Sequence, residues 1–110
     1  MEISSRKINE IEILDVAGEV DLYSSPQLRQ WILKAMGHRE PRLIVHLAQV
    51  SYIDSSGIAT LVEGWQMAKK NHGKLKLAAL GPDTLEVFRF ARLDTVFNIY
   101  ATVEEALADF

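Results

Sequence analysis

The residues with the clearest capacity for chemistry are four consecutive positions near the middle of the chain, Asp54-Ser55-Ser56-Gly57. They lie between an apolar stretch that predicts a strand and an amphipathic stretch that predicts a helix. A helix N-terminus presents free backbone N–H groups and partial positive charge, so it tolerates an anion. A phosphoryl group on Ser55 or Ser56 would add about −1.5 to −2 charges there, beside the Asp54 carboxylate. A partner docked on this loop would then meet repulsion and a desolvation penalty, which is the behaviour of a switch and not of a catalyst.

The same four residues also suit a purely structural role. Asp and Ser are preferred helix caps, and Gly relieves strain in a tight turn. Four residues are a weak motif, because short patterns often occur by chance. Taken alone, the loop therefore favours capping over modification.

Catalytic activity is not predicted. A serine hydrolase needs a base beside its nucleophile and a stabilised oxyanion site, and no nucleophile-elbow pattern surrounds Ser55. The chain has no cysteine, which excludes disulfides, thiolate metal sites and a cysteine nucleophile. His38, His46 and His72 show no ligand spacing and are assigned structural or solvated roles. We therefore expect no metal and no other cofactor.

Length and composition indicate one soluble domain covering residues 1–110, with 48% hydrophobic and 25% charged residues. The net charge of −3 and the scattered Lys and Arg residues exclude a direct nucleic-acid partner. The N-terminus lacks the apolar core of a signal peptide, and no apolar run approaches the roughly 20 residues that a membrane span needs. We expect a cytoplasmic protein without direct membrane insertion.

The elements that must position the central loop follow from apolar periodicity and helix-start signals. Residues 8–20 predict a strand, interrupted at Ala17-Gly18, and residues 3–8 predict a short strand that pairs back across Asn9-Glu10. Further strands are expected at residues 42–47, 74–80 and 96–100. Helices are expected to begin at Ser24-Ser25-Pro26, after the central loop, at Gly81-Pro82-Asp83 and at the capping box Thr102-Val103-Glu104-Glu105.

Alternation of strand and helix from residue 43 onward indicates parallel strands with crossover helices. The N-terminal portion is expected to add antiparallel strands at one side. The predicted architecture is α/β, with a mixed, mostly parallel sheet and about four helices. The buried helix stripes are predicted to comprise Leu28, Trp31, Ile32 and Ala35 in the first helix, Ile58, Leu61, Val62, Trp65 and Ala68 in the second, and Leu85, Phe88 and Ala91 in the third.

Two acidic residues, Asp21 and Asp54, would lie near each other if their loops share one end of the sheet. Paired carboxylates can support acid–base chemistry or hold a metal. Loop capping and an acidic docking rim are the favoured interpretation. Tyr23 is either an exposed interface anchor or a side chain packed on its own helix, and the sequence leaves both open.

Two blocks of sequence resemble those of one family. Val50-Ser51-Tyr52-Ile53-Asp54-Ser55-Ser56-Gly57-Ile58 is similar to the signature of anti-sigma-factor antagonists of the STAS-domain family. A second block of that family is resembled by residues 17–29, which read Ala17-Gly18-Glu19-Val20-Asp21-Leu22-Tyr23-Ser24-Ser25-Pro26-Gln27-Leu28-Arg29. The blocks occur in the family's order and spacing, and the resemblance spans essentially the whole chain. After Gly57 this chain has Ile58-Ala59-Thr60, whereas family members often have Leu, Gly and a small aliphatic residue.

The resemblance implies a partner-switching cycle. The unphosphorylated protein would bind an anti-sigma factor that is also a serine kinase, and so release the sigma factor. The kinase, with its own ATP and Mg²⁺, would phosphorylate Ser55 and dissociate, and a phosphatase would reset the switch. Ser56 would be a supporting residue and a candidate cap of the following helix.

The surface expected to contact the partner comprises the loop at residues 21–25 and the helix start at residues 54–58. The individual residues are Asp21, Tyr23, Ser24, Ser25, Asp54, Ser56, Gly57 and Ile58. The alternative function is an accessory subunit of a membrane transport system or of a signalling scaffold, since STAS-like domains also serve there. One fold hosts several roles.

Overall fold

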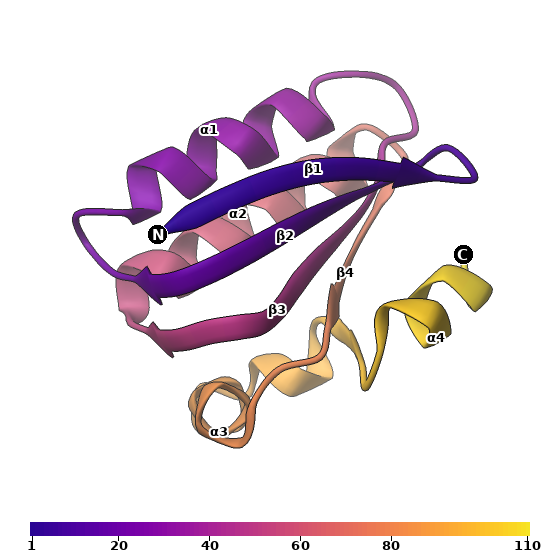
Figure 1. The fold of residues 1–110 in the computed structure, drawn as a ribbon. Coiled ribbons are helices and arrows are strands. Elements are labelled where there is room, and N and C mark those ends of the chain that lie inside the picture. Colours follow the sequence, from indigo (N-terminus) through magenta and orange to yellow (C-terminus); the bar gives the residue numbers. More distant parts are fainter.

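The computed structural model describes residues 1–110 as five strands and four α-helices around one mixed sheet (Figure 1). The strands are β1 (Glu2–Ile8), β2 (Ile11–Val20), β3 (Arg42–Ile53), β4 (Lys74–Ala78) and β5 (Asn98–Tyr100). The helices are α1 (Ser25–Met36), α2 (Ser55–Lys70), α3 (Pro82–Phe90) and α4 (Val103–Ala108), with a short 3₁₀ turn at Leu93–Thr95. The predicted fold class is confirmed.

The strands lie in the order β1-β2-β3-β4-β5. Only β1 is antiparallel to its neighbour, and β2 already pairs with β3 in parallel, so the N-terminal portion adds one antiparallel strand. The predicted hairpin across Asn9-Glu10 is present, with Ile8 opposite Ile11. At Ala17-Gly18 the strand does not break, because the β2–β3 register shifts between Asp15 and Ala17 and again between Gly18 and Glu19. Such bulges absorb an extra residue without ending a strand.

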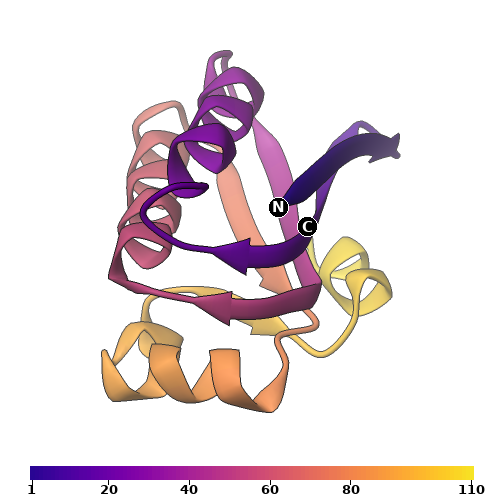
Figure 2. The same cartoon turned by 60° about the vertical axis from the view of Figure 1, so that its left-hand side comes forward.

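Helices cover both faces of the sheet (Figure 2). Helices α1 and α2 lie together on one face, α4 lies on the other, and α3 lies beside the end of β3. The main core fills the α1–α2 face and includes Leu14, Val45, Leu61, Leu77 and Phe88. A smaller core lies under α4 and includes Ile13, Ile44, Ala78, Val103 and Ala106. Apolar burial on both faces explains why β3 reads as a nearly continuous apolar run.

Details of the last third differ from the prediction. β4 ends at Ala78 and β5 begins at Asn98, so both are shorter than expected, and α3 ends at Phe90. Ala91 was predicted to be buried but is exposed. Thr84, which the prediction did not include, is buried. The predicted cap of α4 is confirmed, because the Glu105 N–H donates to Thr102 Oγ1 at 3.1 Å. No helix combines the length and the apolar character that crossing a bilayer requires.

Candidate functional site

Two loops meet at the carboxyl ends of β2 and β3. Val20 lies opposite Ile53 in the last step of the parallel ladder. Beyond that step, the backbone N–H of Asp54 donates to the carbonyl oxygen of Val20 at 3.1 Å. The loop that begins at Asp21 and the helix start at Ser55 therefore form one continuous surface at this end of the sheet.

Asp54 is the N-cap of α2. Its Oδ1 accepts the backbone N–H groups of Ser56 at 2.9 Å and Gly57 at 3.2 Å, and the Ser56 hydroxyl at 2.5 Å. The hydrogen bond from the Ser56 side chain, with those from the backbone, outweighs burial and lowers the pKa of Asp54. Asp54 is therefore a carboxylate at neutral pH. The cap is Asp54 and not Ser56, which corrects the assignment made from sequence.

The two serines of the motif have different environments. Ser56 is half-buried, and its hydroxyl hydrogen is engaged by Asp54. Ser55 is the first residue of α2, is exposed, and makes no side-chain hydrogen bond within the chain. Of the two hydroxyls, only that of Ser55 is free to enter the active site of another protein.

Gly57 brings α2 close to the sheet. A Cβ at this position would lie 2.7 Å from Val20 Cγ1 and 2.8 Å from Ile53 Cγ1. Both neighbours are buried, so neither can readily move aside. The glycine is required here for a close approach and not for an unusual backbone conformation, which replaces the tight-turn explanation given by the sequence.

The loop before α1 is held by Asp21. Its Oδ1 accepts the backbone N–H groups of Tyr23 and Ser24, both at 3.0 Å, and its own N–H donates to the Ser24 hydroxyl at 2.9 Å. These bonds turn Leu22 and Tyr23 outward, where they are 67% and 91% exposed. Tyr23 therefore does not pack on its own helix. Exposed apolar side chains in a rigid loop suit an interface.

The structure brings the predicted site residues together, but these residues differ in how far they are exposed to solvent. Tyr23 and Ser55 are exposed, Asp21, Ser24, Asp54, Ser56 and Ile58 are half-buried, and Ser25 and Gly57 are buried. The buried pair can support the surface from below but offers no side-chain contact to a partner. Leu22 belongs to the predicted loop, yet it was not among the individual residues named from sequence.

Sequence reasoning missed an apolar groove that adjoins Ser55. The groove lies between the start of α2 and α3, has a volume of about 600 Å³, and is lined by Ser55, Ile58, Ala59, Asp83, Glu86, Val87, Phe90 and Ala91. Phe90 is 93% exposed. A signal was present in the sequence: Phe88 and Phe90 are separated by about 200° around a helix, so both cannot face the core.

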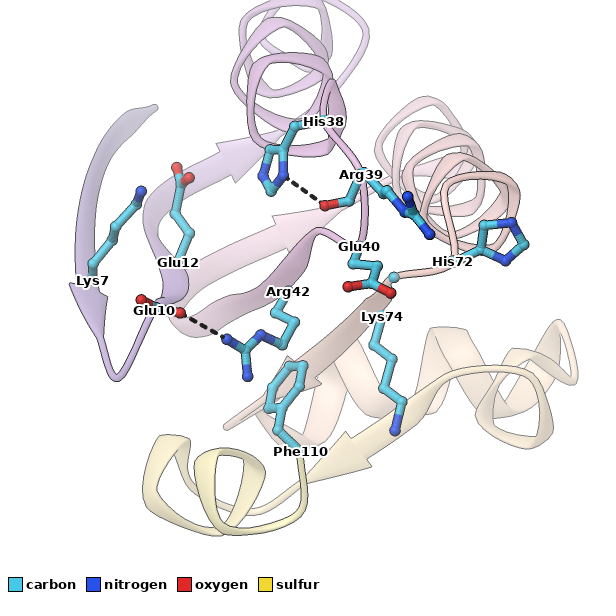
Figure 3. Close-up of a pocket in the computed structure, with 11 residues that line it drawn as sticks. Lys7, Glu10, Glu12, His38, Arg39, Glu40, Arg42, His72, Lys74 and Phe110 are labelled. Atoms are coloured by element: carbon cyan, nitrogen blue, oxygen red, sulfur yellow. Dashed lines mark hydrogen bonds and ion pairs between the residues drawn. The ribbon is translucent and has the colours of Figure 1, made fainter.

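A larger hollow, of about 760 Å³, lies at the opposite end of the sheet (Figure 3). Its lining mixes acidic and basic side chains, including Lys7, Glu12, Glu40 and Lys74. Arg42 Nη2 lies 3.5 Å from Glu10 Oε2 across it. No group of three or more His, Asp or Glu side chains in the molecule is arranged to hold a metal ion.

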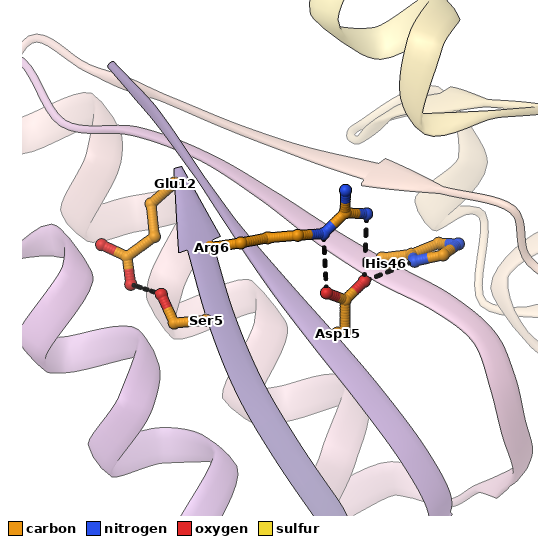
Figure 4. A network of polar contacts seen from close by, with 5 residues as sticks. All are labelled: Ser5, Arg6, Glu12, Asp15 and His46. Carbon is orange, nitrogen blue, oxygen red and sulfur yellow. Dashed lines mark hydrogen bonds and ion pairs between the residues drawn. The ribbon is translucent and has the colours of Figure 1, made fainter. Parts of the chain in front are cut away.

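A polar cluster lies on the same face of the sheet as α4, across β1, β2 and β3 (Figure 4). Arg6 Nε donates to Asp15 Oδ2 at 2.8 Å, and His46 Nδ1 lies 2.7 Å from Asp15 Oδ1. Burial raises the pKa of Asp15, but the hydrogen bonds from Arg6 and His46 outweigh it and hold the pKa below its ordinary value. The cluster joins β1, β2 and β3, which gives His46 the structural role expected for it.

Lys76 is an unexpected core residue, only 1% exposed. Its Nζ donates to the Asp109 carbonyl at 2.5 Å and to the Tyr100 hydroxyl at 3.1 Å, and lies 4.4 Å from the centre of the Phe110 ring. Burial lowers the pKa of Lys76, although the Asp109 carboxylate opposes that shift. Lys76 therefore fastens the C-terminal residues to the sheet, away from Ser55.

Comparison with known proteins agrees with this fold. The STAS domain model matches residues 2–106. The anti-sigma-B factor antagonist of Bacillus subtilis is 34% identical over 96 residues, which cover 87% of this chain and 86% of that protein. A solved anti-sigma factor antagonist from Mycobacterium paratuberculosis is 26% identical, with a TM-score of 0.89 over 98% of this chain and 92% of that one. A STAS-domain antagonist from Planctomyces limnophilus is 25% identical, with a TM-score of 0.86 over 97% and 96%.

A five-stranded mixed sheet covered by helices on both faces is thus the fold of a STAS domain. The chain belongs to the STAS-domain family, and within it to the anti-sigma factor antagonists. Members of this group are regulators that act by binding and not by catalysis.

Proposed function

We propose that this antagonist is a phosphorylation switch whose acceptor is Ser55. In its unmodified form it binds an anti-sigma factor that is also a serine kinase, and so frees the sigma factor. Phosphorylation of Ser55 ends that binding, and a phosphatase restores it. The single observation that supports this most directly is the contrast between two adjacent hydroxyls, one exposed and unbonded at Ser55 and one engaged by Asp54 at Ser56.

The modified chain is expected to keep its fold. The phosphoryl group would lie at the N-terminus of α2, a helix of 16 residues whose partial positive charge tolerates an anion. No side-chain hydrogen bond of Ser55 is lost on modification, because none is made. The effect of the phosphate is therefore exerted on a partner and not on stability.

The surface for the kinase partner is formed by Leu22, Tyr23 and the exposed Ser55 hydroxyl. Asp21, Ser24, Asp54 and Ser56 hold that surface in place, Ser25 and Gly57 support it from below, and Ile58 continues it along α2. A partner that covers Leu22 and Tyr23 also excludes water from Ser55, which belongs to the same surface. Burying an unpaired phosphate there costs more than the roughly 1–3 kcal/mol of a neutral polar group, so affinity should fall at least about tenfold.

The decisive experiment incubates the chain with each serine-kinase anti-sigma factor of its host, with ATP and Mg²⁺, and maps phosphate by mass spectrometry. Ser55→Ala should abolish incorporation, while the matched Ser56→Ala should retain it. Binding of the same kinase, measured by calorimetry, should be lost in the phosphorylated chain. Phosphate on Ser56 instead of Ser55, or equal binding of both forms, would refute the proposal.

The setting of this cycle is the cytoplasm, where sigma factors and ATP are present, and the whole of residues 1–110 would act as one STAS domain. The accessory role in a transport system or scaffold is the competing outcome of the same experiment. It would be favoured if no host kinase modified the chain and the chain instead copurified stoichiometrically with a transporter.

A further inference from the structure

The groove between α2 and α3 shares Ser55 with the loop surface but differs from it in charge. The apolar part of its lining is formed by Ile58, Ala59, Val87, Phe90 and Ala91. Phe90 is 93% exposed, an amount unusual for an aromatic side chain that has no partner. Contiguous apolar surface with a polar rim marks an interaction site.

The rim of the groove is acidic. Asp83 and Glu86 line it, one turn apart on α3, and neither forms an ion pair with another residue of the chain. No basic side chain lines the groove. An occupant of complementary charge would therefore present an apolar side chain flanked by Lys or Arg.

The sign of this charge determines how the groove responds to modification of Ser55. A phosphoryl group there would add about −1.5 to −2 charges to a rim that already holds two carboxylates, with Asp54 next in sequence. A basic occupant would bind more tightly to the phosphorylated chain. Repulsion of the kind that releases a partner would require an acidic occupant, which Asp83 and Glu86 already disfavour.

We propose that this groove binds a basic, apolar-anchored segment of a second protein that prefers the phosphorylated state. The inference rests on the proposed function, in which the loop surface of Leu22 and Tyr23 serves the kinase that is released. Phosphorylation of Ser55 would then weaken the binding of one partner and strengthen the binding of the other. The phosphatase that the cycle requires must recognise the phosphorylated state, so the bound segment is assigned to it.

The test uses the full chain with phosphoserine placed at position 55 by genetic encoding, so that no kinase is needed. The probe is a capped helical model peptide with Leu and Phe on one face and Lys on its flanks. Its comparison peptide has Glu in place of Lys. Affinities for the modified and unmodified chains are measured by fluorescence anisotropy, and the contact surface is mapped from amide chemical shifts.

The Lys peptide should bind the phosphorylated chain about three- to tenfold more tightly than the unmodified chain, as expected for one or two added surface ion pairs. The shifts should map to Ala59, Val87, Phe90 and Ala91. Phe90→Ala should weaken binding about tenfold. The matched control is Tyr52→Ala, which removes an aromatic side chain that is 53% exposed and lies outside the groove, and it should leave binding unchanged.

Three results would overturn the inference. They are equal binding of the Lys and Glu peptides, no preference for the phosphorylated chain, and no loss of affinity in Phe90→Ala. Because the phosphoserine is installed directly, these failures are distinct from failure of the proposed function, which would show as absence of modification by any host kinase.

Discussion

Replacing Gly57 with alanine probes how the site is held to the sheet. The added Cβ would lie 2.7 Å from Val20 Cγ1 and 2.8 Å from Ile53 Cγ1. Two carbon atoms in favourable contact are about 3.5–4.0 Å apart, so the methyl group would overlap both neighbours by about 0.7 Å or more. Val20 and Ile53 are buried and β-branched, which restricts their rotamers, so the start of α2 must move instead.

The free energy of unfolding follows from two opposing terms. Overpacking a core by one methyl group costs about 1–3 kcal/mol. Alanine gains about 0.5–1 kcal/mol over glycine in a helix, which offsets part of that cost. The difference between the middle values of these two ranges is about 1.3 kcal/mol, and we expect Gly57→Ala to lower the free energy of unfolding by about that amount.

Urea unfolding, followed by the fluorescence of Trp31 and Trp65, measures this change. Gly81→Ala is the control, because a Cβ at Gly81 meets nothing within 4 Å. Gly81 is the N-cap of α3, so this variant should lose only the N-cap preference for glycine over alanine, about 0.5 kcal/mol, and should leave the amide resonances of Ser55 and Asp54 unchanged. The displaced helix start should also shift the amide resonances of Ser55 and Asp54. A Gly57→Ala variant as stable as the parent, with unchanged resonances, would refute the close-approach argument.

Three further predictions concern other parts of the molecule. The hydrogen bond to Asp109 raises the pKa of Tyr100 to about 12. The stability that this hydrogen bond gives is full below pH 10.0 and is lost as the pH rises toward 12. The difference in urea midpoint between the parent and Tyr100→Phe should therefore shrink over that range. The lowered pKa of Asp15 gives stability above pH 3.8 that is lost as the pH falls further. Below pH 3.8, the urea midpoint of Asp15→Asn should therefore depend less on pH than that of the parent. Leu22→Ala and Tyr23→Ala should each weaken kinase binding about tenfold by calorimetry while the urea midpoint stays unchanged.

The fold was predictable from sequence where periodicity and capping agree. The stripe of Leu28 and Ile32, the apolar run of β3 and the Thr102 cap each predict one local structure, and each of those structures is present. The third helix was less accurate because its stripe was read from apolar residues alone. Thr84 takes a buried position that the pattern assigned to no residue, and Ala91 lies beyond the end of the helix.

The site was predictable in its location but not in its details. Motif and resemblance identified the Ser55 loop, yet only the three-dimensional structure shows that an Asp54 oxygen caps the helix and that the Ser55 hydroxyl is the free one. The burial of Lys76 could not be read from alternation along β4, because it depends on α4, more than twenty residues later, covering that face of the sheet. The groove at Phe90 likewise depends on how α3 lies against the start of α2.

The direction of β1 has a practical consequence for studying this protein in assemblies. Because β1 runs antiparallel to β2, Glu2 pairs with Ala17, close to where β2 ends at the Ser55 surface. Phe110 lies at the other end of the sheet, lining the hollow with Lys7 and Glu10. A fluorophore or affinity tag joined after Phe110 would leave both proposed docking surfaces accessible, whereas one joined before Met1 would crowd them. Energy-transfer sensors of the switch should therefore carry their label at the C-terminal side.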